Sequence, residues 1–501
     1  MNMRIALLLL PYLFQFGMGA SLQIHFESLG KPEIVKEPPK ETDVFTVIEA
    51  ANKDSKMVRI EGDIAVNIGR SAMKCDQDSC RWKKNTSGKV NVPYTISPDF
   101  SADEVDVITT AMQDFATLTC VQFIPRSSEP DFVQIISDSG CWSYVGRIGG
   151  RQDLSLAKTD CMRRGTIQHE LNHALGFFHE QSRSDRDNYI DVITENIMPG
   201  FYENFNKYDT NNLGLEYDYG SVMHYGRSAF SLRPGQADTI VPKPNKTVTI
   251  GQRYGLSNLD ISKINKLYQC DVCSTLLPDS TGSLISTNYP SNYPNNAKCY
   301  WLIRTPSDKV FLQFSAFDVQ RSADCTSDYF KVYDGANTSS PVLLDRACGA
   351  GQVPSLVSSA SMMLLEFVSD RQTTATGFKA TYSTVNCGST LTSSSGVFSS
   401  PNYPLNYKIF SECTWVILAP VGFKVSLTMT DFNVERQRTC SYDYVLVFDG
   451  PKPTSPQKGK YCGQVNVPPI ESSGNSLLVQ FHSDGSVVAK GFLANYAFIP
   501  L

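Results

Sequence analysis

The chain has 501 residues, of which 41% are hydrophobic and 19% charged, and its formal net charge is −5 at pH 7. This length exceeds what one hydrophobic core accommodates, so at least three domains are expected. The slight acidic excess gives no electrostatic basis for binding nucleic acid or an anionic membrane surface.

Residues 1–20 predict secretion. Arg4 precedes an apolar run from Ile5 to Phe16, and the small residues Gly17 and Gly19 follow. This composition is typical of a signal peptide cut near residue 20, and the run is too short to span a bilayer. No later stretch is long and apolar enough to anchor the chain, so we expect an extracellular product without a membrane anchor.

All fourteen cysteines follow this segment. An even count in an exported chain indicates a disulfide framework, although spacing leaves the connectivity open. Three Asn-x-Ser/Thr triplets, at Asn85, Asn245 and Asn337, are candidate glycosylation sites in the same compartment. The alternative is that they are unused surface triplets.

Residues 21–70 contain no cysteine, are rich in Lys, Glu and Pro, and end at Gly69-Arg70-Ser71. A polar segment between a signal and a cysteine-bearing domain is typical of a propeptide. A flexible N-terminal extension is the alternative.

Residues 71–271 carry mixed helix and strand signals. Ser101 is a good helix cap, and apolar residues recur at helical spacing from Val105 to Phe115, which predicts a helix over 101–118. The run Val133–Ile136 predicts a strand.

The last 230 residues contain an internal repeat of 114 residues. Asn288-Tyr-Pro recurs as Asn402-Tyr-Pro, and Cys299-Tyr-Trp301 recurs as Cys413-Thr-Trp415. Short alternating runs such as Tyr444–Phe448 are separated by turn-forming residues, which predicts an antiparallel β-sandwich for each repeat. The two domains are expected at 273–384 and 387–499.

Three histidines carry the predicted chemistry. His169 and His173 are four residues apart, so on a helix they lie on one face and can share one metal ion. Gly176 can adopt a left-handed conformation, which ends the helix and lets His179 approach as a third ligand. Three imidazoles leave one position open, as a catalytic zinc site requires. Glu170 is then placed to take a proton from the attacking water, so we expect one catalytic zinc ion per chain and Glu170 as the general base.

Three other interpretations fit less well. A structural zinc site usually has four ligands, is rich in cysteine, and would leave Glu170 unexplained. A serine protease, faintly suggested by Asp138-Ser139-Gly140, has no suitable upstream base, because the only earlier histidine, His25, lies in the expected propeptide. A binding protein with an inactive protease domain is disfavoured because the metal ligands and the general base are all present.

The pattern resembles the metzincin peptidases, and Glu180 directly after the third histidine resembles the astacin family within them. Ser221-Val-Met223-His-Tyr225 is similar to that family's Met-turn. The resemblance implies an α+β protease domain and a zinc endopeptidase that cleaves extracellular proteins. It also implies that Met223 forms an apolar floor under the metal, and that Tyr225 is a weak extra zinc ligand that stabilises the oxyanion.

The segment before the protease domain matches the family as well. Ile60-Glu-Gly-Asp63 resembles the propeptide motif Phe-x-Gly-Asp, with Ile in place of Phe, and this implies that Asp63 binds zinc in the zymogen. Cleavage after Arg70 would create a new N-terminus at Ser71, which the family places near Glu180. Without the family, Asp63 would be interpreted as an ordinary turn residue.

The two repeats resemble CUB domains, which would position substrate or localise the enzyme through protein contacts. A protease domain with two CUB domains, and an early cysteine pair, resemble the hatching enzymes, which digest the egg envelope. The disulfides that these resemblances imply are Cys75–Cys80, Cys120–Cys270, Cys141–Cys161, Cys273–Cys299, Cys325–Cys348, Cys387–Cys413 and Cys440–Cys462.

Many CUB domains bind calcium through one Glu and two Asp side chains, which are hard oxygen ligands. The second repeat has all three at the matching positions, Glu435, Asp443 and Asp484. The first repeat has Gln320, Asp328 and Asp370, and the lost charge argues against calcium there. A solvated acidic edge is the alternative for both.

Overall fold

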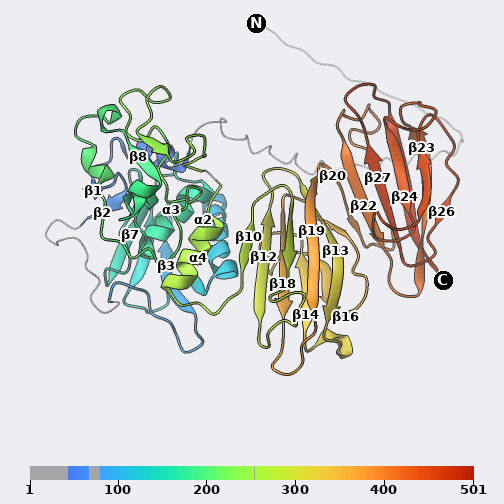
Figure 1. Ribbon diagram of the computed structural model, residues 1–501, viewed down its shortest axis with the longest axis horizontal. Coiled ribbons are helices and arrows are strands. Elements are labelled where there is room, and N and C mark those ends of the chain that lie inside the picture. The colour runs from blue at the N-terminus through green and yellow to red at the C-terminus, as the bar shows by residue number, and fades with distance from the viewer. Residues whose placement is uncertain (1–42, 67–78, 253) are drawn as a thin grey trace, which may run out of the picture. The chain divides into compact units, whose positions relative to one another are not determined.

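A computed structural model of the chain describes residues 43–66, 79–252 and 254–501 (Figure 1). The predicted signal peptide, the cleavage site Arg70–Ser71 and Cys75 lie outside the described residues. Within the described residues, no helix combines the length and the apolar character that crossing a membrane requires.

A seven-stranded sheet runs through the N-terminal domain in the order β1-β2-β6-β7-β5-β3-β4. The strands β3, β4, β5 and β7 pair in parallel, and β6 is antiparallel to β7. The bounds are β1 Arg59–Ile60, β2 Ile64–Ala65, β3 Val90–Ile96, β4 Val121–Pro125, β5 Phe132–Ile136, β6 Cys141–Ser143 and β7 Arg151–Leu156. The strand predicted over 133–136 is therefore confirmed as β5.

Two strands from the predicted propeptide extend this sheet at one edge. Ile64 of β2 lies opposite Ser143 of β6 in a parallel pair, and β1 is antiparallel to β2. The backbone hydrogen-bonding groups of β6 are thus paired with a segment that precedes the domain.

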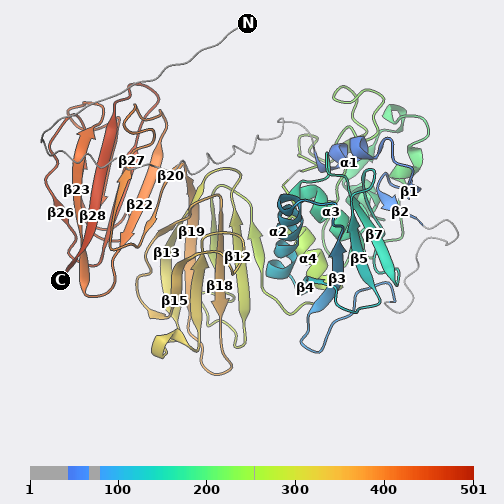
Figure 2. The same ribbon diagram turned by 180° about the vertical axis from the view of Figure 1, so that it is seen from behind.

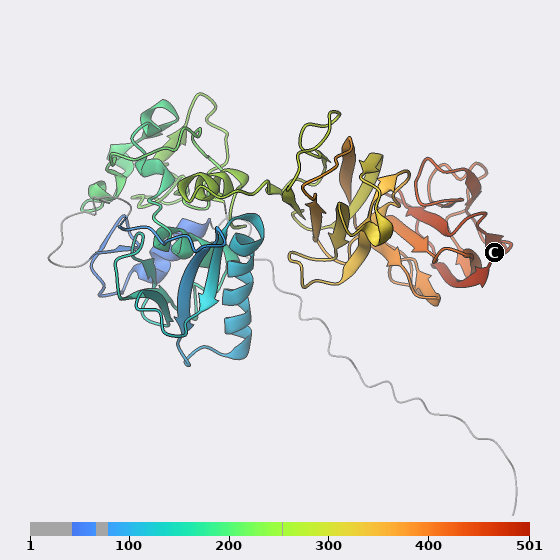
Figure 3. The same cartoon turned by 90° about the horizontal axis from the view of Figure 1, so that it is seen from below.

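The described part of this domain has four α-helices, which are α1 Val44–Asn52, α2 Ala102–Leu118, α3 Arg164–Ala174 and α4 Asn258–Leu267. The helix predicted over 101–118 is confirmed as α2. Ser101 and Glu104 form a reciprocal capping box at its start, and Ile108, Met112 and Phe115 are buried in the core. Seen from behind, α2 and α3 lie beside the sheet (Figure 2), and the view from below shows α2 running along it (Figure 3).

The second half of the domain is mostly irregular. It contains the antiparallel pair of β8 (Ile190–Val192) and β9 (Ile240–Pro242), which are far apart in the sequence. Its short 3-10 helices are η2 Glu180–Ser182, η3 Arg186–Asn188, η4 Thr194–Asn196 and η5 Tyr202–Phe205. Such segments lack the regular backbone pairing of the sheet, and the disulfides Cys120–Cys270 and Cys141–Cys161 constrain the domain covalently.

The first C-terminal repeat is a sandwich of two sheets. One has the order β10-β12-β18-β14-β15, and the other has the order β11-β19-β13-β16, with β17 also paired to β13. The bounds are β10 Thr275–Leu277, β11 Gly282–Ile285, β12 Lys298–Arg304, β13 Lys309–Val319, β14 Tyr329–Tyr333, β15 Val342–Ala347, β16 Gly349–Ala350, β17 Leu356–Val357, β18 Met362–Val368 and β19 Gly377–Val385, with the short helix η6 Ala323–Cys325.

The second repeat has the same arrangement, with sheets β20-β22-β27-β24-β25 and β21-β28-β23-β26. The bounds are β20 Cys387–Leu391, β21 Ser395–Ser399, β22 Glu412–Leu418, β23 Phe423–Asn433, β24 Tyr444–Phe448, β25 Gln457–Tyr461, β26 Ile470–Glu471, β27 Ser476–His482 and β28 Gly491–Pro500. The prediction of two β-sandwich domains is confirmed.

One strand pair in each sandwich is parallel rather than antiparallel. These pairs are β10 with β12 and β20 with β22. Between the two partners the chain forms a strand of the opposite sheet, β11 or β21, and then returns in its original direction. A crossover of this kind yields parallel neighbours, whereas a direct hairpin yields antiparallel ones.

Candidate active site

Helix α3 carries the first two histidines of the predicted site. His169 and His173 lie on one face of this helix and are fully buried. The helix ends where the sequence predicts, because Gly176 has φ +107° and its N–H donates to the carbonyl oxygen of His173 at 2.8 Å. The chain then turns back and brings His179 beside both rings.

The Nε2 atoms of the three histidines meet the carboxylate of Asp63. The Nε2 atoms of His169 and His179 are 3.1 Å apart, and Asp63 Oδ2 lies 3.0 Å from His169 Nε2. Asp63 Oδ1 lies 3.3 Å from His179 Nε2 and 3.5 Å from His173 Nε2. One ligand atom from each of these four residues lies within 4.8 Å of all the others.

The second nitrogen of each ring has its own hydrogen-bond acceptor. The Nδ1 atoms of His169 and His173 lie 2.8 Å and 2.7 Å from the carbonyl oxygens of Val222 and Phe177. A carbonyl oxygen only accepts, so both rings carry their proton on Nδ1 and direct the Nε2 lone pair into the cluster.

Several acceptors therefore face one another in a buried site. His173 Nε2 and Asp63 Oδ1 have no hydrogen-bond partner although both are buried. Lone pairs that converge in this way are stabilised by a cation, and three imidazoles with one carboxylate suit Zn²⁺. The residues thus fit the zinc site that the sequence predicts.

Asp63 reaches the histidines because β6 and the Asn52 side chain both hydrogen-bond to its segment. The N–H of Ser143 donates to the Asp63 carbonyl oxygen at 3.1 Å. The Asn52 side chain donates to the carbonyl oxygens of Gly62 and Cys141 and accepts from the Cys141 N–H. Burial alone would raise the pKa of Asp63, but His179 and His173 outweigh it and hold that pKa well below the usual range.

Glu170 lies beside this cluster and is fully buried. Neither of its carboxylate oxygens has a hydrogen-bond partner in the described structure. Burial raises the pKa of Glu170 well above its usual range, and the nearby Asp63 carboxylate raises it further. A carboxyl group in this position can accept a proton and later return it, as the general base of this reaction requires.

The predicted Met-turn, Ser221–Tyr225, contacts His169 through the Val222 carbonyl oxygen, and its Met223 and Tyr225 are buried. The Tyr225 hydroxyl donates to the Glu61 carbonyl oxygen at 2.7 Å, so this tyrosine is engaged by the predicted propeptide. The ring of Phe45 in α1 stacks on Tyr225 with centroids 3.8 Å apart.

Glu61 makes a second set of contacts through its side chain. Its Oε2 lies 2.7 Å from His179 Nδ1, and its Oε1 accepts from the Ser182 hydroxyl. Glu61 is 1% exposed and has φ +49°, an unusual conformation for a residue other than glycine. The sequence motif contained Glu61 at its variable position, so sequence reasoning missed it, together with Phe45 and Asn52.

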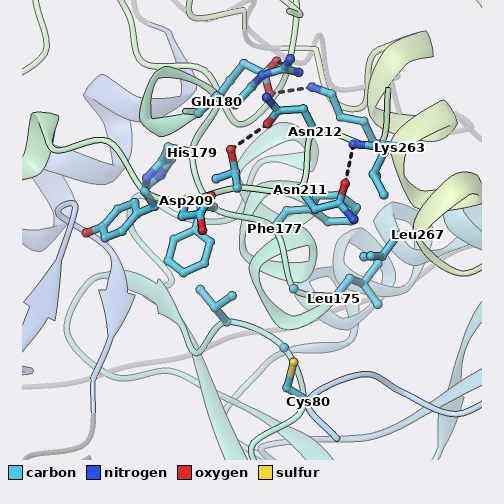
Figure 4. Close-up of a pocket in the computed structure, with 18 of the residues that line it drawn as sticks. Cys80, Leu175, Phe177, His179, Glu180, Asp209, Asn211, Asn212, Lys263 and Leu267 are labelled. Atoms are coloured by element: carbon cyan, nitrogen blue, oxygen red, sulfur yellow. Dashed lines mark hydrogen bonds and ion pairs between the residues drawn. The ribbon is translucent and has the colours of Figure 1, made fainter. Parts of the chain in front are cut away.

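Glu180 lies next to a cavity of about 220 Å³ whose wall includes Phe177, Tyr208 and Lys263 (Figure 4). Its Oε2 accepts from Lys263 Nζ at 2.6 Å, and its Oε1 accepts from Arg183 and from the Asp218 N–H. The predicted partner of the new N-terminus is therefore already paired with two cations in this structure.

The three predicted calcium ligands of the second repeat are brought together. One carboxylate oxygen from each of Glu435, Asp443 and Asp484 lies within 4.8 Å of the other two. Asp443 is 1% exposed and accepts from the Tyr407 hydroxyl and from the Asp484 N–H. Glu435 Oε2 is buried without a partner, and burial together with Asp443 raises the pKa of Glu435.

In the first repeat, hydrogen-bond donors of the protein itself satisfy Asp328, the counterpart of Asp443. Asp328 accepts from the Tyr293 hydroxyl and the Asp370 N–H, as its counterpart does. With its amide nitrogen facing inward, Gln320 donates to Asp328 Oδ1 at 3.3 Å and to the Thr373 carbonyl oxygen at 3.1 Å. An amide donor thus replaces the charge that a cation would supply.

The remaining predicted residues lie away from this centre. Asn85 and Asn245 are exposed and Asn337 is half-buried, and each side-chain oxygen accepts from the hydroxyl two residues later. Besides the two disulfides named above, the structure contains Cys273–Cys299, Cys325–Cys348, Cys387–Cys413 and Cys440–Cys462. The pairing of Cys75 with Cys80 remains a prediction.

Comparison with known proteins gives matches over most of the chain. Residues 76–269 match the peptidase family described as Astacin, and residues 273–382 and 387–496 each match the CUB domain. The embryonic protein UVS.2 of Xenopus laevis is 48% identical and aligns over 100% of both chains. An astacin-like metalloendopeptidase of Coturnix japonica is 46% identical over 76% of this chain and 97% of its own length.

Among solved structures, high choriolytic enzyme 1, a hatching enzyme zinc-protease from Oryzias latipes, is 54% identical. The match covers 40% of this chain and 100% of that chain, with a TM-score of 0.39.

Zinc should stabilise the full-length chain through His169, His173 and His179. With free zinc at about 100 times its Kd, the expected gain in unfolding free energy is about 2.7 kcal/mol. His179→Ala should lose most of this gain, whereas His482→Ala, at the half-buried end of β27, should keep it. Thermal unfolding of chelator-treated protein with and without zinc measures the difference, and equal gains in both variants would contradict the site.

Proposed function

The chain belongs to the astacin family of zinc metalloendopeptidases and carries two CUB domains, and on this premise we propose its biological role. It is secreted, is made as an inactive precursor, and hydrolyses peptide bonds in extracellular proteins, including those of the egg envelope. This proposal rests mainly on the buried cluster in which the three histidine Nε2 atoms lie close to the Asp63 carboxylate. The peptidase residues are complete, and a carboxylate from the preceding segment occupies their centre.

In the active enzyme, His169, His173 and His179 hold the zinc ion, which supplies Lewis acidity to the reaction. Glu170 accepts a proton from the attacking water and returns it to the leaving amine. Its two unpartnered carboxylate oxygens support this assignment, because no group of the described chain occupies them by a hydrogen bond. The Tyr225 hydroxyl steadies the negative charge that develops on the substrate carbonyl oxygen and serves as a weak zinc ligand.

In the precursor, the segment 43–65 blocks this machinery at two points. Asp63 takes the open position among the histidines, and Glu61 engages the Tyr225 hydroxyl through its carbonyl oxygen. Burial with Glu61 nearby raises the pKa of Tyr225 well above its usual range, so the hydroxyl stays protonated and remains a donor. We assign residues 1–20 to the signal peptide, 21–70 to the propeptide and 71–271 to the protease domain.

Maturation follows from cleavage between Arg70 and Ser71. The cavity beside Glu180 is large enough for a short chain end, which supports the assignment of this carboxylate as the partner of the new α-amino group. Because Lys263 and Arg183 already pair with Glu180, the new N-terminus has to share or displace these cations.

Extracellular action has independent support. Six disulfides lie among the described residues, and disulfides persist in oxidising compartments. The relative that aligns over the whole chain is described as an embryonic protein, which fits a substrate such as the egg envelope. The CUB domains, which mediate protein contacts in this class of enzyme, would bring such substrates to the protease domain.

We further propose that the second CUB domain binds one Ca²⁺ through Glu435, Asp443 and Asp484, whereas the first binds none. The unpartnered Glu435 Oε2 supports the first half of this proposal, and the amide of Gln320 supports the second.

Glu170→Gln should lower peptidase activity of the matured enzyme by about 10²–10⁴-fold, the range typical of a lost general base. Zinc content should stay at that of the parent, because Glu170 is not a ligand. The control Glu195→Gln changes an exposed side chain in η4 and should leave turnover unchanged. Full turnover by Glu170→Gln would assign the base to another residue.

Asp63→Ala should give an uncleaved precursor that digests a peptide substrate measurably. The control is Asp54→Ala, which removes an exposed carboxylate from the same segment and should leave the precursor silent. Both proteins need a blocked cleavage site at Arg70, so that activity reports on the intact segment. An equally silent Asp63→Ala precursor would contradict the proposed inhibition.

Exchanging one residue between the CUB domains should exchange their calcium binding. Equilibrium dialysis should find one Ca²⁺ per chain in the parent, none in Glu435→Gln, and two in Gln320→Glu, since each change removes or adds one hard oxygen ligand. An unchanged stoichiometry in both variants would show that these residues do not decide calcium binding.

A further inference from the structure

The N-terminus of α4 contacts the Met-turn directly, although Asp260 and Val222 are 38 residues apart in the chain. Asp260 is 4% exposed and directs both carboxylate oxygens at this turn. Its Oδ1 accepts from the Ser221 hydroxyl at 2.6 Å, and its Oδ2 accepts from the Val222 N–H at 2.9 Å. A buried carboxylate that accepts several hydrogen bonds fixes the backbone that donates them.

Val222 in turn holds a zinc-binding histidine. Its carbonyl oxygen lies 2.8 Å from His169 Nδ1. Val222 thus donates its N–H to Asp260 and accepts from His169 with its carbonyl oxygen. The hydrogen bond at the second ring nitrogen sets the tautomer and the orientation of a ligating histidine. A shift of the Val222 backbone would therefore turn the His169 ring.

The other side of the Met-turn is held by the segment that follows His179. The Glu180 N–H donates to the Met223 carbonyl oxygen at 3.0 Å, and the Tyr225 N–H donates to Gln181 Oε1 at 3.2 Å. Without Asp260 the turn would keep these two hydrogen bonds. It would lose the hydrogen bonds that Ser221 and Val222 donate to Asp260. The loss is thus confined to the part that contacts His169.

We propose that Asp260 is a positioning residue for the zinc site, acting on His169 through Val222. The inference rests on the proposed zinc centre and adds to it a residue 91 positions beyond the histidine it orients. Asp260 touches neither zinc nor substrate.

A purely structural role for Asp260 can be separated from this one. Asp260 also forms the capping box of α4 with Ser257: Ser257 Oγ accepts from the Asp260 N–H at 2.8 Å, and Asp260 Oδ2 accepts from the Ser257 N–H at 2.9 Å. Ser257→Ala therefore damages the same helix cap but leaves the Asp260 bonds to Ser221 and Val222 in place. It is a control for the lost cap in Asp260→Ala, and it also removes the hydrogen bond that the Ser257 hydroxyl donates to Asp218 Oδ2.

The test measures zinc affinity of the full-length precursor by competition with a chromophoric chelator. Both Asp260→Ala and Ser257→Ala should lower the unfolding temperature through the lost cap. Only Asp260→Ala should raise the Kd for zinc, by about tenfold, at the low end of the range for outer partners of metal ligands. Asp260→Asn should also raise the Kd for zinc. This variant decides the question if Asp260→Ala does not fold.

Equal zinc affinity in Asp260→Asn, Ser257→Ala and the parent would overturn the positioning role. Failure of the parent itself to bind zinc would instead overturn the proposed zinc centre, so the two failures are distinguishable.

Discussion

The meeting of three buried imidazole Nε2 atoms is the constraint on which the rest of this protein depends. Each ring is fixed by an acceptor on its other nitrogen, and two of these acceptors are backbone carbonyl oxygens. Converging lone pairs repel one another unless a cation lies between them. The fold therefore has to hold the rings rigidly and also provide the ion with its remaining ligand.

The surrounding elements can be understood from this requirement. Helix α3 sets the spacing of the first two rings, and the left-handed turn at Gly176 brings back the third. The Met-turn supplies the Val222 carbonyl oxygen to His169, and α4 holds the Met-turn through Asp260. Residues that contact no substrate thus contribute to the geometry of the ligands.

The segment 43–65, which we propose blocks the enzyme, contacts both the histidines and Tyr225 of the Met-turn. Pairing of β2 with β6 gives it a fixed register, and Asn52 ties α1 to the same edge. The strand pairing thus helps to fix the position of the Asp63 carboxylate. On the proposed function, removal of the segment would free the histidine centre and the Tyr225 hydroxyl together.

The sequence predicted the parts that depend on local spacing. The two histidines on α3, the turn at Gly176, the helix cap at Ser101 and the repeated sandwiches all follow from residues close together in the chain. The contacts of Glu61, Phe45 and Asp260 could not be predicted, because each depends on segments between 38 and 180 residues apart that only folding brings together. The sequence indicated a lost charge at Gln320, but the hydrogen bond that its side-chain amide donates to Asp328 required the structure.

X-ray absorption at the zinc edge, measured on the purified precursor, tests the central claim most directly. The account predicts one zinc ion per chain with three imidazole nitrogens and one carboxylate oxygen as ligands. Sulfur in the first coordination shell, or a precursor that retains no zinc after dialysis against metal-free buffer, would contradict it.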